Sequence, residues 1–440
     1  MKMATVSDYT ETGLAIGLSH TQEDDNQQVY WEPSEYFYHT KAKQWYHWAK
    51  THWEELTQDQ MVTLHIGPAI EVMAPAPGLQ KLKNLRAIAT LLSARLAGEP
   101  DFGKYLSFEN GHLDLKDYKF YGQSTSIKNV YSLPYKYDKN AKAPEMLKIL
   151  RANFPNDEEL LYVITVLGTL LCPDIISKIH LAIFDHQGEG DTGKTFLTEH
   201  GIAGALGEYS VEINQAFFCG SHPDMFESAA FEDKLMYYCD DLNEPINDGP
   251  YKRIVGAPHI KVRKMHTQGY KVVNTGKLFT NSNDLPTFKG KKSKATYNRL
   301  CLIPFSIPVP AKDKRKYNFY EAEYPGIINL LVMGAKLYRK ANCNVTIPKS
   351  FLQYVRNAEV EDNNYNDFIS AHVVKSIGSS ERPAAIFKAY NNYLSKQNIM
   401  QRWNESERRT FYNLIAPELR QIGAIKEHSN GPIWRNIKLI

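Results

Sequence analysis

Short apolar runs alternate with longer mixed segments over residues 179–288. The runs at 179–184, 235–239 and 276–280 have the length and the aliphatic and aromatic content of strands, and the segments between them fit helices. Strands that alternate with helices favour a parallel sheet with crossover helices. The hydrophobic pattern therefore predicts an α/β core in this part of the chain.

Upstream, the pattern changes to helices and one hairpin. Leucine and isoleucine recur at three- and four-residue spacing over residues 78–97, which predicts a helix. Residues 105–115 alternate on both sides of Asn110-Gly111, which is a hairpin signal. Residues 143–172 predict two helices that are broken at Phe154-Pro155.

The second of these helices has a start signal, and another helix follows the α/β core. Asn156 can cap that second helix, and Glu159 follows at the spacing of a capping box. Residues 323–340 predict the further helix. The longest apolar stretch, 160–172, is shorter than the roughly twenty residues of a membrane span, so it predicts a buried core helix and no membrane partner.

The two ends of the chain differ from the middle. Residues 1–35 are polar and predict a mobile arm, whereas residues 30–53 are dense in aromatic side chains. These aromatics either form a small core or, beside nearby lysines, stack on bases. The tract 362–367 predicts a loop at a boundary. Beyond it, two helices (384–395 and 405–419) and two strands around the turn 429–432 give the outline of a winged helix.

Composition narrows the class of protein, and charge placement indicates its partner. Of the 440 residues, 43 % are hydrophobic and 23 % charged, which is typical of a globular chain. The five cysteines form no CxxC pair, and no apolar core follows the first residues; both fit a cytoplasmic protein without disulfides. The net charge is only +3, but residues 249–299 hold twelve Lys or Arg and one acid, and residues 388–440 hold nine basic and four acidic groups. The first 35 residues hold seven acids and one lysine. This distribution predicts a polyanion that meets part of the molecule.

The strand predicted at 179–184 leads into a phosphate-binding motif. Gly188 to Thr195, GEGDTGKT, matches G-x-x-x-x-G-K-[ST]. Its glycines allow backbone N–H groups to face phosphate oxygens, Lys194 can neutralise the β- and γ-phosphates of ATP, and the Thr195 hydroxyl can bind Mg²⁺. The alternative is a glycine-rich turn with a surface lysine. The candidate nucleotide-binding residues are Gly188, Glu189, Gly190, Asp191, Thr192, Gly193, Lys194, Thr195 and Phe196.

An acidic pair follows about 45 residues later. The largely apolar run 234–239 is followed directly by Asp240 and Asp241. Asp240 can hold Mg²⁺ together with Thr195, and Asp241 can orient or deprotonate the attacking water. Such a run also fits a plain strand that enters a surface turn.

Three further features lie between residues 259 and 305. The strand at 276–280 leads to Asn281 and Asn283, either of which can sense the γ-phosphate; the alternative is an Asn/Asp turn. Arg299 precedes another apolar strand, where it is an arginine finger for a neighbouring subunit or an ordinary surface residue. Residues 259–273 predict a basic hairpin that either contacts a nucleic-acid backbone or is a solvated face. Its candidate DNA-binding residues are Lys261, Arg263, Lys264 and His266.

In this order, the motifs resemble those of the superfamily 3 helicases, whose fold is of the AAA+ class. The similarity is greatest to the poxvirus-, phage- and plasmid-type primase-helicases and extends over roughly residues 105–440. The segments 108–115 and 133–137, the helical block 144–171 and the segment 323–334 carry it, together with the motifs above and the winged-helix tail. No primase-type arrangement of carboxylates and histidine is evident in residues 1–140.

The resemblance implies roles for single residues and for the assembly. Lys194 and Thr195 match the nucleotide-binding pair, and Asp240 and Asp241 match the paired acids. Asn283 matches the sensor better than Asn281 does. Arg299 matches the arginine finger, and Lys264 and His266 match the tip of the DNA-binding hairpin. A homo-hexameric ring that moves 3′ to 5′ on single-stranded or forked DNA is implied, with a separate primase or polymerase as a partner.

These observations predict three regions and one function. Residues 1–138 form an acidic arm and an aromatic-rich collar or docking region with mixed and helical structure. Residues 139–345 form a helical bundle and an AAA+ P-loop ATPase core with a parallel sheet, and residues 346–440 form a basic winged-helix domain. The predicted function is an ATP-dependent replicative DNA helicase of a virus, phage or mobile element, which would act in the host cytoplasm. The alternatives are an ATPase that loads or remodels a partner, and a nucleotide-switched DNA-binding initiator.

Overall fold

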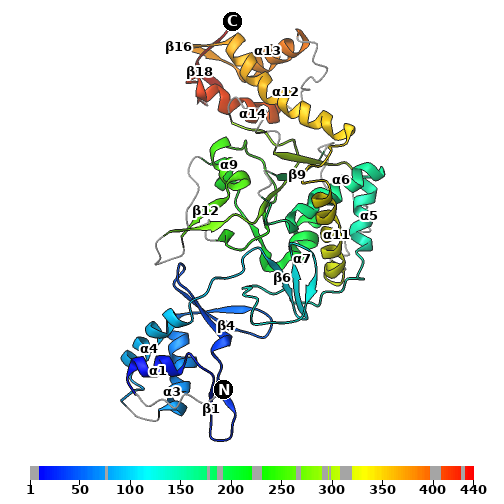
Figure 1. Cartoon of the computed structure of the whole chain (residues 1–440). Helices are drawn as coiled ribbons and strands as arrows, with labels where there is room; N and C mark the ends of the chain where they lie inside the picture. Colours follow the sequence, from blue (N-terminus) through cyan, green and yellow to red (C-terminus); the bar gives the residue numbers. More distant parts are fainter. Residues whose placement is uncertain are drawn as a thin grey trace.

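Three parts of the chain follow one another along the long axis of the molecule (Figure 1). The computed structural model describes residues 9–74, 78–175, 179–185, 192–220, 230–263, 269–289, 296, 299–307, 320–396, 408–427 and 432–440. An N-terminal layer and a C-terminal unit lie at opposite ends of a central α/β part.

A five-stranded parallel sheet forms the centre. Its strands lie in the order β10-β11-β14-β9-β15, and every neighbouring pair is parallel. Strand β9 is buried along its whole length, as expected for a parallel strand covered on both faces. The strands predicted at 179–184, 235–239 and 276–280 are confirmed. The bounds are β9 His180–Asp185, β10 Ser210–Glu212, β11 Met236–Cys239, β14 Lys277–Ser282 and β15 Leu300–Phe305.

Helices cover the sheet, and two of them approach each other closely. A Cβ on Gly334 would lie 2.0 Å from the Ile164 carbonyl oxygen, so glycine permits α6 and α11 to pack backbone to backbone. The bounds are α5 Pro144–Asn153, α6 Asp157–Gly168, η3 Thr169–Leu171, η4 Phe196–Ala203, α7 Gly204–Leu206, η5 Gly207–Tyr209, α8 Ala216–Cys219, α9 Asp248–Gly256 and α11 Tyr320–Lys340.

The helix break at Phe154-Pro155 is confirmed, but only half of the expected capping arrangement is present. The Asn156 side chain accepts a hydrogen bond from the Glu158 backbone N–H at 2.8 Å and so caps α6. Glu159 does not complete a capping box. Its carboxylate instead accepts a hydrogen bond from the Ser350 hydroxyl at 2.6 Å and so contacts helix α12 (Lys349–His372).

The predicted hairpin at 105–115 forms, and it shares the hydrophobic core of the sheet. Leu106, Phe108 and Leu113 pack in one buried cluster with α6, α11 and the central strands. The small antiparallel sheet has the order β6-β7-β8. Its strands are β6 Tyr105–Phe108, β7 Gly111–Asp114 and β8 Phe120–Tyr121.

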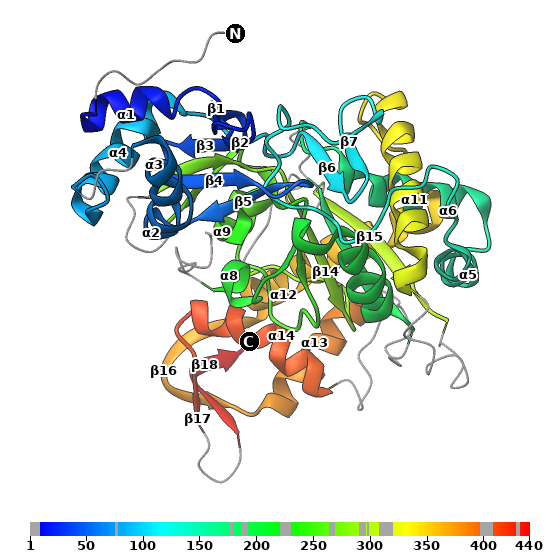
Figure 2. The ribbon, with the colours of Figure 1, turned by 90° about the horizontal axis from the view of Figure 1, so that it is seen from below.

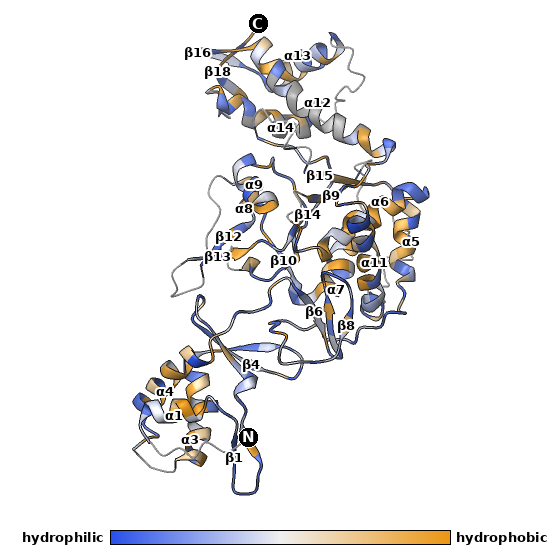
Figure 3. Ribbon diagram, in the orientation of Figure 1, coloured by the Kyte–Doolittle hydropathy of each residue, from blue (hydrophilic) through white to orange (hydrophobic). Residues whose placement is uncertain are grey.

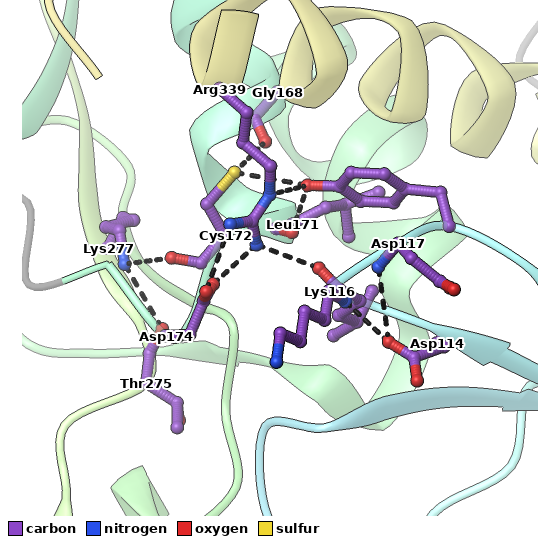
Figure 4. A network of polar contacts seen from close by, with 12 residues as sticks. Asp114, Lys116, Asp117, Gly168, Leu171, Cys172, Asp174, Thr275, Lys277 and Arg339 are labelled. Carbon is purple, nitrogen blue, oxygen red and sulfur yellow. Dashed lines mark hydrogen bonds and ion pairs between the residues drawn. The ribbon is translucent and has the colours of Figure 1, made fainter. Parts of the chain in front are cut away.

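A polar network ties this hairpin to the amino ends of the central strands (Figure 4). The Arg339 guanidinium of α11 donates to the Asp174 carboxylate, to the Leu115 carbonyl at 3.0 Å and to the Tyr118 hydroxyl at 2.9 Å. Buried Lys277, the first residue of β14, donates to the Cys172 carbonyl at 3.3 Å. Burial lowers the pKa of Lys277 to about 8. The network thus joins the hairpin and α11 to the amino end of β14.

The N-terminal layer is folded from residue 9 onward, so the mobile arm predicted for residues 1–35 is wrong there; residues 1–8 lie outside the described part. Leu14, Ala15 and Leu18 are fully buried against helix α4, and the Trp31 indole N–H donates to the Leu18 carbonyl at 2.6 Å. The bounds are α1 Glu11–Gly17, β1 Gln22–Glu23, β2 Val29–Trp31, η1 Pro33–Glu35, β3 Tyr36–His39, β4 Gln44–Trp48, β5 Trp53–Leu56, α2 Gln58–Gln60, η2 Met61–Ile66, α3 Gly67–Met73 and α4 Leu82–Arg95.

Most of the aromatic side chains of residues 30–53 are core residues. Trp45, Tyr46 and Trp53 are at most 1 % exposed, and Phe37 stacks on Tyr46 with ring centroids 4.7 Å apart. Of the two interpretations left open by the sequence, the aromatic core therefore holds for these residues. The helix predicted at 78–97 is also confirmed, as α4.

The C-terminal unit joins helices to a three-stranded antiparallel sheet of order β16-β18-β17. The loop predicted at 362–367 is wrong, because α12 runs through it. Tyr365, Phe368 and Ile369 are buried at helical spacing in the core of this unit, and this packing outweighs the local preference of Asn and Asp for turns. The bounds are α12 Lys349–His372, β16 Val373–Glu381, α13 Pro383–Lys396, α14 Arg408–Gln421, β17 Ile425–Glu427 and β18 Ile433–Leu439.

Hydropathy follows the same packing. In Figure 3 the helices around the sheet carry both hydrophobic and hydrophilic residues, as elements with one buried side do. Figure 2 shows the N-terminal helices and β3–β5 to one side of the central part, and α13 and α14 away from them. Among the described residues, no helix has the length and apolar character needed to cross a membrane.

Candidate functional site

Lys194 lies at the carboxyl end of the central strand β9, within a shell of oxygen atoms. Its ammonium donates to the Asn283 side-chain oxygen at 3.2 Å and to the Thr192 hydroxyl at 3.4 Å, and it lies 3.6 Å from an Asp185 carboxylate oxygen. Gly193 has a φ of 85°, which suits glycine, and a helix begins directly after it. The strand before the motif and the helix after it are present as expected, whereas residues 186–191 lie outside the described residues.

Thr195 and Asp240 meet although 45 residues separate them. The Thr195 hydroxyl lies 3.2 and 3.1 Å from the two carboxylate oxygens of Asp240. The parallel pairing of β11, β14 and β9 brings the residues after each strand to one edge of the sheet. A hydroxyl and a carboxylate at this spacing are hard oxygen ligands of the kind Mg²⁺ prefers.

The two asparagines at the carboxyl end of β14, Asn281 within the strand and Asn283 just after it, have different surroundings. Asn281 is 1 % exposed; its amide donates to Asp240 Oδ1 at 2.6 Å, and its oxygen accepts from the Thr198 hydroxyl at 3.0 Å. Asn283 is exposed and contacts Lys194. The structure therefore brings both candidates to the site, Asn281 to the acid and Asn283 to the lysine.

Asp241 occupies a turn after β11 and is exposed. Its φ is 58°, a left-handed value that Asp tolerates better than most residues do. The Asn243 amide donates to Asp241 Oδ2 at 3.4 Å, and the Gln215 amide donates to the Asn243 oxygen at 3.0 Å. Asp241 thus lies beside Asp240 at the same edge of the sheet.

The electrostatic environment of Asp240 is acidic. Burial, followed by the charges of Asp240 and Glu212, raises the pKa of the Glu199 carboxyl. Burial and then Asp240 raise the pKa of the Cys239 thiol to about 12. Carboxylates gathered in this way favour a divalent cation over an anion at this point. Lys194, at the start of the helix that follows β9, supplies positive charge nearby.

Arg299 is not part of this cluster within one chain. Its carbonyl accepts the His180 N–H at 2.7 Å, so it lies at the amino edge of the sheet beside the start of β9. Six residues of β9 at about 3.3 Å each separate that edge from Asp185, which is roughly 20 Å.

The basic hairpin forms as predicted at its described strands. Strands β12 His259–Val262 and β13 Tyr270–Val273 pair in antiparallel register, with Lys261 opposite Lys271 and both exposed. Arg263 is exposed directly after β12. The Tyr270 hydroxyl donates to Glu232 at 2.8 Å and so fastens the hairpin to the loop before β11.

Some predicted site residues lie outside the described residues. These are Gly188, Glu189, Gly190, Asp191, Lys264 and His266, whose roles stay predictions. Phe196 is described; it is partly exposed at the start of η4, and its ring lies 5.8 Å from that of His200.

Two residues of the site were missed from the sequence. Asp185 ends β9 one residue beyond the predicted strand, and an acid directly after an apolar run was the signal for it. Thr198 lies one turn of helix after Lys194 and supports Asn281 through its hydroxyl. No sequence signal marked Thr198, because its role depends on contact with β14.

Two family models match parts of the chain. Residues 29–155 match the model described as D5 N terminal like, and residues 186–299 match a family of unknown function, DUF5906. The first match supports a relation to viral and phage replication proteins of the primase-helicase kind. The second spans the phosphate-loop motif, the acidic pair, the hairpin and the asparagines.

Among solved structures, the chain is similar to the NrS-1 C-terminal region. The apo A form of that region has 12 % identity and a TM-score of 0.47, with 92 % of this chain and 96 % of that chain covered. Two further apo structures of the same region have 12 % identity and TM-scores of 0.44. No curated protein matches.

Proposed function

We propose that this chain is an ATP-dependent DNA helicase of the superfamily 3 type that acts in replication. The observation that carries the proposal is the convergence of five side chains at one edge of a parallel sheet: Lys194, Thr195, Asp240, Asn281 and Asn283. That edge, outside the carboxyl ends of the strands, is where open α/β sheets bind ligands.

The residues present fit a nucleotide with Mg²⁺. Lys194 would neutralise the β- and γ-phosphates, and Thr195 and Asp240 would hold the metal ion, the remaining ligands being water and phosphate oxygens. Mg²⁺ supplies charge neutralisation on the transferring phosphoryl group. No group of three His, Cys, Asp or Glu side chains that could hold a metal occurs among the described residues.

The remaining polar residues prepare the reaction. Asn281 holds Asp240 in one orientation through its amide, and Thr198 in turn fixes Asn281. Asp241, exposed beside Asp240, would orient the attacking water or accept its proton. Lys194 donates a hydrogen bond to Asn283, which directly follows β14. Loss of the γ-phosphate would therefore alter the contacts of Lys194 and, through this hydrogen bond, the end of β14.

The proposal that the chain acts on DNA is supported by exposed basic side chains, and not by the nucleotide site. Lys261, Arg263 and Lys271 are exposed on a hairpin that follows β11 in the chain and precedes β14. In the chain, this hairpin therefore connects the segment that holds Asp240 and Asp241 to the segment that holds Asn281 and Asn283. Both segments would respond to bound nucleotide. The C-terminal helices and sheet supply a second basic segment of winged-helix outline.

The test measures ATP hydrolysis with and without single-stranded DNA, and then unwinding of duplexes that carry a 3′ or a 5′ tail. Stimulation by DNA and unwinding from a 3′ tail support the proposal. Hydrolysis without any unwinding favours an ATPase that loads or remodels a partner. Nucleotide binding without hydrolysis favours the nucleotide-switched initiator.

A further inference from the structure

The ammonium of Lys194 already has three oxygen partners within its own chain. Its side chain is 9 % exposed, and that of Asp185 is fully buried. A lysine ammonium has three N–H groups, and the contacts with Asp185, Asn283 and Thr192 account for them. A nucleotide phosphate that approached Lys194 would have to share or replace these partners.

Of the three partners, Asp185 is the one that matters most for a phosphate. Its side chain is a carboxylate at the end of the fully buried strand β9, whereas the side chains of Asn283 and Thr192 are neutral. Burial strengthens its attraction to Lys194 and its repulsion of a polyphosphate, because charges in a protein interior are screened weakly.

We propose that Asp185 is a counter-ion that occupies Lys194 in the nucleotide-free chain and that nucleotide phosphates displace. Asp185 then sets nucleotide affinity: it stabilises the empty site and opposes the bound state. This inference rests on the proposed function for the identity of the ligand. Asp185 is a positioning residue, since it acts through Lys194.

The decisive variant is Asp185→Asn, which keeps the shape of the side chain and removes its charge. We expect it to bind Mg·ATP and inorganic pyrophosphate at least about tenfold more tightly by calorimetry. In the absence of ligand its thermal midpoint should fall, because a buried lysine loses its carboxylate. Its stabilisation by saturating Mg·ATP should exceed that of the wild type, since tighter binding gives a larger shift.

Asp284→Asn is the matched control. It removes the same charge from the same edge of the sheet, but Asp284 is exposed, and we expect less than a twofold change in either affinity. Asp185→Ser serves as a second variant if the asparagine does not fold, with the same expected direction.

The outcomes separate this inference from the proposed function. A wild-type protein that is folded and binds neither Mg·ATP nor pyrophosphate refutes the nucleotide site itself. A wild type that binds, with unchanged or weaker binding in both Asp185 variants, overturns only the counter-ion role. Tighter binding in Asp185→Asn but equally in Asp284→Asn also overturns it, because the effect would then be one of general charge.

Discussion

At the scale of single residues, Lys194 combines the central role in the site with a structural one. Lys194→Ala removes the charge that would meet the β- and γ-phosphates in the proposed site, and we expect ATP hydrolysis to fall at least about a hundredfold, or about 2.7 kcal/mol of transition-state stabilisation. It also leaves the buried Asp185 carboxylate without its lysine, so the thermal midpoint should fall.

A double variant separates the two effects of this change. Lys194→Ala combined with Asp185→Asn removes both charges, so it should regain much of the lost thermal stability while staying inactive. The measurements are a steady-state ATPase assay and a thermal melt of each variant. Near-normal turnover in folded Lys194→Ala would contradict the proposed site.

Asp233 gives a prediction about stability that is independent of nucleotide. It is buried, accepts the Gly103 N–H at 2.7 Å through Oδ1, and has no hydrogen-bond partner at Oδ2 among the described residues. Burial raises its pKa from the ordinary 3.8 to about 8. The folded state therefore keeps the proton of Asp233 up to about pH 8, whereas the unfolded state releases it near pH 4. Because the folded state binds more protons between pH 4 and pH 8, the contribution of Asp233 to the free energy of unfolding falls as the pH rises through this range.

Asp233→Asn keeps the acceptor for Gly103 and tolerates the φ of 57° at this position. We expect the difference in unfolding free energy between the variant and the wild type to be near zero at pH 4. It should grow to a few kcal/mol in favour of the variant by pH 8. Chemical denaturation at intervals of one pH unit measures this, and a difference that does not vary with pH would show that Asp233 is not the titrating group.

At the scale of elements, the hairpin β12–β13 carries the proposed DNA contact. Lys261→Ala with Arg263→Ala removes two exposed charges beside buried Val262 and should leave the hairpin folded. We expect weaker binding of single-stranded DNA and slower unwinding, with the salt dependence of binding reduced by about two counter-ions. Basal ATPase without DNA should be little changed.

The control for this pair is Lys81→Ala with Lys83→Ala, two exposed lysines at the start of α4. The control pair removes the same net charge from the N-terminal layer. Fluorescence anisotropy at several salt concentrations compares the pairs. Equal losses in both would show that the hairpin has no specific part in DNA binding.

The elements that sequence predicted well are those whose own residues decide the outcome. Strands β9, β11 and β14 are short apolar runs, and the Asn110-Gly111 hairpin follows from a turn that glycine permits. The elements that were missed depend on distant contacts. Helix α12 continues through 362–367 because Tyr365 and Phe368 are buried in the C-terminal core, and α1 forms because Leu14 packs on α4.

The candidate site shows the same division. The phosphate-loop motif and Asp240 were found because each is a local pattern at the end of a strand. The partnership of Lys194 with Asp185 was not found, since it depends on where the helix after Gly193 places the lysine. The contrast between Asn281 and Asn283 was likewise left open, because only the sheet shows that one faces Asp240 and the other faces Lys194.

At the scale of the whole molecule, Arg299 raises the question of assembly. It lies at the amino edge of the sheet, roughly 20 Å from its own chain's Asp185, which is too far for it to complete the proposed nucleotide site of its own chain. Near it, burial raises the pKa of the Tyr251 hydroxyl, and the Arg299 charge opposes that shift, which places the guanidinium beside α9. A finger role therefore requires a second copy of the chain.

If Arg299 acts in a neighbouring subunit, Arg299→Ala should bind Mg·ATP almost normally and hydrolyse it about a thousandfold more slowly, because the lost charge acts in the transition state. Mixing it with Lys194→Ala gives the sharper test. Some interfaces of a mixed ring pair an intact lysine with an intact arginine, so ATPase should reappear in proportion to those interfaces. Light scattering and two affinity tags establish that the rings are mixed. If such rings stay inactive, Arg299 has no role in a neighbouring site; its place beside α9 is then structural, and the single variant should lose thermal stability rather than activity at a fixed folded concentration.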